Sequence, residues 1–202
     1  MSLSASELAM TLPERDSRLR RRVAVFAGSG LGVLGLLAWA CGEAVVFPLL
    51  PEFALVIVVV AAPRSAVRLG VAAAVGSLIG GGLMYVLAAH GVVPPASLTT
   101  PLMHTTAAAD VAARGAGALR GQPMSGIPYK VYGLMAGRAR VGLGPFLAAS
   151  VPGRASRILI VTAISGLFGA VTRRWRRWYP VFVVLFVVVF ATGLAAVVRS
   201  WS

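Results

Sequence analysis

The stretch Gly42-Glu43-Ala44-Val45-Val46-Phe47-Pro48-Leu49-Leu50-Pro51-Glu52-Phe53 decides the fold, because it sets two carboxylates in an apolar run that two prolines interrupt. Proline breaks a helix, so the pattern predicts a broken or re-entrant segment over residues 42–62. A charged side chain near the centre of a bilayer costs roughly 2.5–3.5 kcal/mol, and it is usually kept for a pathway, a relay or an ion pair. Glu43 and Glu52 are therefore the first candidate functional residues.

The composition extends this interpretation to the whole chain. Hydrophobic residues make up 58% of the 202 residues and charged residues 12%, with a mean hydropathy of +0.85. One soluble core of this size needs far less apolar surface, so we expect an all-α polytopic integral membrane protein. The net charge of +13 would suit nucleic acid, but the arginines flank the apolar runs, so we expect no nucleic-acid partner.

Long apolar stretches predict about four transmembrane helices, each close to the 20 residues that a bilayer requires. These stretches cover residues 23–40, 69–89, 154–172 and 180–198. Proline-broken stretches at 42–62 and 123–153 predict two re-entrant segments, and the connector between them predicts a short interfacial helix over 106–119. Glycines at 76, 80, 81 and 82 predict close packing of the second span against a neighbouring helix.

The arginine clusters predict the orientation. Residues 1–22 are expected to form a cytoplasmic basic tail, and residues 173–202 an interface cluster followed by the C-terminal span. The protein is thus expected in the cell (inner or plasma) membrane, multi-pass, with a cytoplasmic N-terminus. The side of Arg64 and Arg68 stays open: they lie outside if residues 42–62 dip and return, and inside if these residues cross.

A basic segment later in the chain complements the acidic one. Arg154 and Arg157 follow Val151-Pro152-Gly153 and lie three residues apart, so on a helix they share a face. We expect them at the N-terminal end of that helix, where free N–H groups favour an anion. The guanidinium fork suits phosphate or carboxylate. The alternative is that both arginines extend to lipid headgroups or pair with the two acids.

The order of these segments predicts where they meet. Transporters built from inverted repeats place their sites where two discontinuous segments meet near the midplane. Glu43 and Glu52 would then face Arg138, Arg154 and Arg157, giving mutual neutralisation and a cationic pocket for an anionic headgroup.

Other chemistry finds little support in the sequence. His90 and His104 lack acidic or cysteine neighbours at ligand spacing, and Cys41 is the only cysteine, so we expect no metal and no cofactor. No nucleophile and base pair can be named, so we expect no enzyme.

Several short motifs together resemble one family. They are Glu43-x4-Pro48-x2-Pro51-Glu52, the glycine-rich run from Gly76, Ile127-Pro128-Tyr129-Lys130-x6-Gly137, Pro145-Phe146-Leu147-x2-Ser150 and Gly153-Arg154-x2-Arg157. Over residues 40–172 this order resembles the DedA family, also called VTT or SNARE-associated membrane proteins, and within it the YqaA-like branch. The DedA/VTT-like membrane domain would then cover residues 23–172.

The resemblance implies a function. Members resemble flippases for undecaprenyl phosphate or scramblases for phospholipids, so we expect a lipid transporter whose partners are membrane lipids with an anionic phosphate headgroup. By the resemblance, Arg154, Arg157 and Arg138 would bind the substrate, and Glu43 and Glu52 would supply counter-charge or proton coupling. Two alternatives stay open: a proton-coupled transporter of small ions or drugs, and a scaffold without transport. A homo-oligomer is compatible with each.

Overall fold

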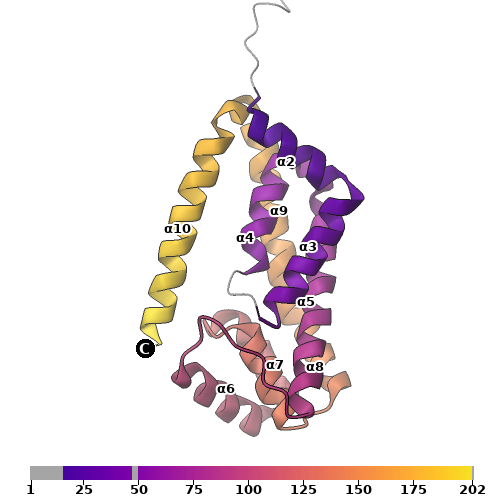
Figure 1. The fold of residues 1–202 in the computed structure, drawn as a ribbon, viewed down its shortest axis with the longest axis vertical. Coiled ribbons are helices and arrows are strands. Elements are labelled where there is room, and N and C mark those ends of the chain that lie inside the picture. The colour runs from indigo at the N-terminus through magenta and orange to yellow at the C-terminus, as the bar shows by residue number, and fades with distance from the viewer. Residues whose placement is uncertain (1–15, 47–49, 202) are drawn as a thin grey trace, which may run out of the picture.

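The computed structural model describes residues 16–46 and 50–201, and within these ranges every regular element is a helix (Figure 1). The α-helices, in chain order, are α2 (Arg18–Gly28), α3 (Gly30–Glu43), α4 (Pro51–Ala61), α5 (Ala66–Ala89), α6 (Pro101–Arg114), α7 (Tyr129–Arg138), α8 (Leu143–Ser150), α9 (Ser156–Val171) and α10 (Tyr179–Ser200). Phe47, Pro48 and Leu49, on which part of the predicted break falls, lie outside the described residues. The predicted all-α class is confirmed over the described ranges.

Two helical runs are long and apolar enough to cross a membrane. They are Pro63–Ala89, which contains α5, and Leu143–Ser200, which contains α8, α9 and α10. The second run folds back on itself at Trp175, where the backbone leaves the helical region (φ −106°, ψ 19°). A third candidate is the bent pair α2 and α3. Residues 16–46 and 50–201 therefore contain two or three helices suited to a bilayer, and the span predicted over 69–89 corresponds to α5.

The first predicted span is not one straight helix. Instead of a continuous element over 23–40, α2 and α3 meet at an angle of 84° at Ser29. Ser29 has extended backbone angles, and its hydroxyl accepts a hydrogen bond from Gly32 N at 3.1 Å, so it caps a new helix. Glycine on each side of Ser29 disfavours a continuous helix, which explains the break.

The arginines of several segments gather at the end of the molecule where α2 begins. Arg20 Nη2 donates to the carbonyl of Ala61 at the end of α4, at 2.7 Å. Arg68 Nη2 donates to the carbonyl of Gly28 at 2.6 Å. The chain thus descends along α3, returns along α4 and begins α5 at the same end (Figure 1). This arrangement places Arg68 at the same end of the molecule as the N-terminal arginine cluster. The sequence had left the side of Arg68 open.

Helix α5 is the central element of the bundle, packing against α3, α7 and α9. A side chain at Gly76 or Gly80 would collide with backbone atoms of Leu37 or Cys41 in α3, and one at Gly81 with the ring of Tyr129. These three glycines permit the close approach that the sequence predicted.

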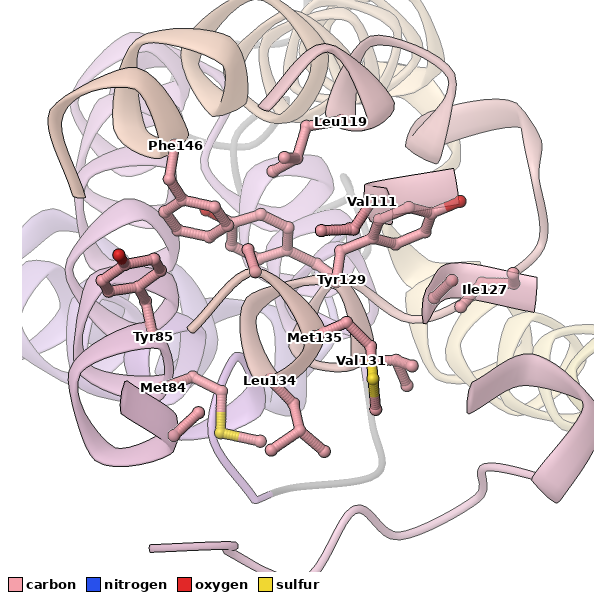
Figure 2. Close-up of a cluster of buried hydrophobic side chains, with 14 of the residues drawn as sticks. Met84, Tyr85, Val111, Leu119, Ile127, Tyr129, Val131, Leu134, Met135 and Phe146 are labelled. Carbon is pink, nitrogen blue, oxygen red and sulfur yellow. The ribbon is translucent and has the colours of Figure 1, made fainter. Parts of the chain in front are cut away.

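Two apolar cores stack along α5. One joins α3, α4, α9 and the first half of α5, through Leu36, Leu55, Leu69 and Ile158. The other joins the second half of α5 to α6, α7 and α8, and Figure 2 shows its side chains. There the rings of Tyr85 and Tyr129 lie 5.3 Å and 6.0 Å from that of Phe146. The polar residues of the next section lie between these cores.

Helix α10 runs beside the bundle (Figure 1) and contacts it near its two ends and in its middle, where Phe186 and Phe190 pack against Phe53 of α4. At its start, the hydroxyl of Tyr179 donates to the carbonyl of Ile57 in α4 at 2.8 Å. At its end, the hydroxyl of Thr100 donates to the carbonyl of Trp201 at 2.8 Å. Many of its valine and leucine side chains are exposed, as expected of a helix in contact with lipid.

Candidate functional site

Several chain interruptions meet at one level, between the two cores. Helix α3 ends at Glu43, α4 begins at Pro51, α7 begins at Tyr129, and a π-helical turn (Val151–Ala155) joins α8 to α9. Ser77 of α5 lies at the same level, near the middle of that 24-residue helix. Backbone irregularities inside a membrane protein require protein or a cavity around them, which makes this level the candidate site.

Arg154 is the centre of the site. Its side chain is 1% exposed, its Nη2 donates to Glu43 Oε2 at 2.6 Å, and its Nε donates to Ser77 Oγ at 2.7 Å. The guanidinium carbon lies 5.2 Å from the centre of the Tyr129 ring, within range of a cation–π contact. The remaining nitrogen, Nη1, is buried without a hydrogen-bond partner among the described residues. Arg154 thus retains a donor that a ligand oxygen could satisfy.

The expected helix N-terminus at Arg154 is wrong. The π-helical turn continues α8 into α9, so no free N–H groups are presented there. Pro152 and Gly153 account for the turn, because proline and glycine both disturb the regular helical ladder. Instead, α7 presents its N-terminus to the site: it begins after Pro128 without a side-chain cap from the described residues. Its first turn lines the same cavity as Arg154.

A second ion pair lies beside the first. Arg157 Nε is 3.1 Å from Glu52 Oε1, with the arginine half-buried and the glutamate 5% exposed. The approach lacks hydrogen-bond geometry, and neither oxygen of Glu52 has a hydrogen-bond partner in the described parts of the chain. The structure therefore brings four of the five predicted site residues together as two ion pairs.

A cavity of about 490 Å³ opens beside the two pairs. Its charged lining, among the described residues, consists of Lys130, Arg154, Arg157 and one carboxylate, Glu43. The wall therefore carries an excess of positive charge, which favours an anionic occupant. The first turn of α7 adds the positive end of a helix dipole to the same wall.

Lys130 is one of two site residues that the sequence prediction missed, and Ser77 is the other. Lys130 is 2% exposed and occupies the first turn of α7, where the helix dipole disfavours a cation. A signal was present: Lys130 is the only lysine among 19 basic residues, and it lies two residues after Pro128 in an apolar stretch. Ser77 carried no comparable signal, since a serine in a glycine-rich span is ordinary.

Arg138 lies apart from the cavity. It is the last residue of α7, is exposed, and belongs to the opposite end of that helix from Lys130. Its charge acts on His104 of α6: burial, together with nearby Arg138, lowers the pKa of that histidine below 6.5. The prediction that Arg138 binds the same ligand as Arg154 finds no geometric support.

Comparison of the chain with protein-family models, with curated proteins and with solved structures finds no match.

Proposed function

We propose that this chain is a membrane lipid transporter that binds the phosphate of a polyprenyl phosphate or a phospholipid and moves it between leaflets. One observation carries the proposal. One cavity wall contains a buried arginine, a buried lysine and a helix N-terminus. Among the described residues, one arginine nitrogen has no hydrogen-bond partner and the lining has one carboxylate. Phosphate groups bind to arginine, lysine and helix N-termini, and a phosphate bears more than one acceptor for these donors.

The depth of the site supports a transport role. Ser77 lies about 17 Å along α5 at 1.5 Å per residue, close to the middle of a hydrocarbon core of roughly 30 Å. The two Pro-broken segments, 42–62 and 123–153, contribute Glu43, Glu52 and Lys130, in the manner of re-entrant segments in an inverted repeat. The resemblance to DedA proteins supports the same arrangement, with the arginine-rich end of α2 at the cytoplasmic face.

Reconstitution into liposomes tests the proposal. A fluorescent polyprenyl phosphate is exposed to a quencher that does not cross the bilayer, and the rate at which inner-leaflet probe becomes quenched is measured. We expect wild type to exchange the probe, Lys130→Met to lose exchange, and Arg138→Gln, which removes an exposed charge outside the cavity, to retain it. Exchange no faster than in protein-free liposomes would overturn the proposal.

A proton-coupled transporter of small ions or drugs is the second candidate. It is favoured by Glu52, a buried carboxylate without a hydrogen bond from the described residues, which could take up and release a proton. This candidate predicts ion or drug flux that depends on a pH gradient and is lost in Glu52→Gln, with no response to added polyprenyl phosphate.

A further inference from the structure

An apolar groove along α10 adjoins the cavity of the candidate site. The groove has a volume of about 490 Å³ and runs from Phe53 and Val187 to Val198 and Arg199. Apart from Arg199 at its end, its lining among the described residues is apolar. The twelve residue steps from Val187 to Arg199 correspond to about 18 Å of helix at 1.5 Å per residue.

The groove and the cavity share part of their walls. Leu98, Phe190 and Leu194 line both of them. On α10, Phe190, Leu194 and Val197 face the cavity, while Ala191, Ala195 and Val198 line the groove. Two adjacent faces of one helix thus border the charged cavity and the apolar groove, and the side chains of Leu98, Phe190 and Leu194 lie between the two.

We propose that the groove binds the hydrocarbon chain of the same lipid whose phosphate occupies the cavity beside Arg154, Lys130 and Arg157. This inference rests on the proposed function and adds to it the place where the hydrocarbon chain of the substrate binds. The inference rests on one observation: a cationic cavity and an apolar groove adjoin each other, and they match the two parts of an amphipathic phosphate.

The position of α10 explains how such a lipid reaches the site. The helix is held at Tyr179 and Trp201 and by the packing of Phe186 and Phe190 against Phe53 of α4, and part of its surface borders the cavity and the groove. A headgroup can therefore enter the charged cavity while its chain remains in contact with bilayer hydrocarbon. The chain never needs to pass through the packed core of the bundle.

Filling the groove tests the inference. Ala191→Trp and Ala195→Trp place bulk in the groove, and Thr192→Trp and Ala196→Trp are matched controls on exposed positions of α10 outside its lining. We expect the two groove variants to slow exchange of a long-chain polyprenyl phosphate at least about tenfold, which corresponds to about 1.4 kcal/mol in the barrier. The two control variants should exchange at the wild-type rate.

Thermal unfolding in detergent separates chain binding from phosphate binding. A water-soluble short-chain alkyl phosphate should stabilise wild type and the groove variants equally, because the phosphate cavity is intact in both. The long-chain polyprenyl phosphate should stabilise wild type further, but not the groove variants. If a tryptophan variant fails to accumulate, Ala191→Leu and Ala195→Leu provide the same test with a smaller side chain in the groove.

The outcomes distinguish this inference from the proposed function. Groove variants that exchange like the controls, while Lys130→Met is inactive, overturn the groove and leave lipid transport standing. Absence of exchange in wild type, together with long-chain stabilisation that the groove variants lose, overturns transport and retains the chain site. Equal stabilisation of wild type by short-chain and long-chain phosphates overturns the groove directly.

Discussion

Arg154→Gln and Glu43→Gln, alone and combined, test whether the buried ion pair organises the site. Arg154→Gln leaves the Glu43 carboxylate, 3% exposed, without its charged partner and removes the 2.6 Å and 2.7 Å hydrogen bonds. Glu43→Gln leaves a guanidinium that is 1% exposed without a counter-charge. Removing one member of a buried pair costs about 3–5 kcal/mol, so each single variant should lose stability on this scale.

The double variant should be more stable than the sum of the single effects predicts. Two neutral amides at these positions can bond to each other, and replacing both members of a buried pair is far less costly than removing one. We therefore expect a coupling free energy of at least about 2 kcal/mol in the double-mutant cycle. The quantity to measure is the free energy of unfolding in detergent micelles, followed by tryptophan fluorescence.

An exposed pair provides the matched control. Arg114 Nη2 lies 2.8 Å from Asp110 Oδ1 on α6, but the arginine side chain is 50% exposed, so Arg114→Gln should cost no more than about 0.5 kcal/mol. Additive effects of the Glu43 and Arg154 substitutions, within about 0.5 kcal/mol, would refute the interpretation of a coupled buried pair.

Three further predictions concern packing, titration and the charge at the end of α7. Gly80→Ala should destabilise the bundle by about 1–3 kcal/mol, because the new methyl group meets the Cys41 carbonyl. Gly82→Ala should be tolerated, because its new methyl group would lie 3.5 Å from Leu147 Cδ2. Equal unfolding midpoints of the two variants would contradict the close contact of α3 and α5. The pKa of His104 is lowered below 6.5 in the folded protein, so the unfolded chain takes up a proton at a higher pH than the folded chain does. The free energy of unfolding should therefore fall as the pH drops from about 6.5 toward the pKa of His104 in the folded protein. His104→Gln should remove this component of the pH profile, and His90→Gln, on an exposed histidine, should keep it; a profile unchanged by His104→Gln would contradict the assignment. Arg138→Gln should leave binding of a short-chain alkyl phosphate within about twofold of wild type, a change of roughly 0.4 kcal/mol, and a larger loss would return this arginine to the site.

Local patterns explain what the sequence predicted correctly. The length and polarity of apolar runs reveal helices suited to a bilayer, as the span over 69–89 illustrates. Glycines spaced along one span indicated the close contacts that Gly76, Gly80 and Gly81 make. Charged residues in apolar sequence were conspicuous because burial of charge is costly. Of the five predicted site residues, all but Arg138 lie together in the structure.

The errors arose where two local signals competed. Apolar composition predicted one helix over 23–40, but the glycines around Ser29 and its capping hydroxyl end one helix and start another. The proline and glycine before Arg154 predicted a helix start, but packing on both sides keeps α8 and α9 continuous through a π-helical turn. Neither outcome could be chosen from the neighbouring residues alone.

By itself the sequence determined the all-α class, the apolar runs suited to a bilayer and the charged residues that lie beside prolines within them. Only the tertiary structure decided which of them meet: Arg154 pairs with Glu43 across 111 positions and with Ser77 across 77, while Lys130 joins the cavity and Arg138 does not. The physical reason is that hydropathy and helix breaks depend on neighbouring residues, which can be read along the chain. The partner of a buried charge depends on which helices pack together, and that is a property of the whole fold.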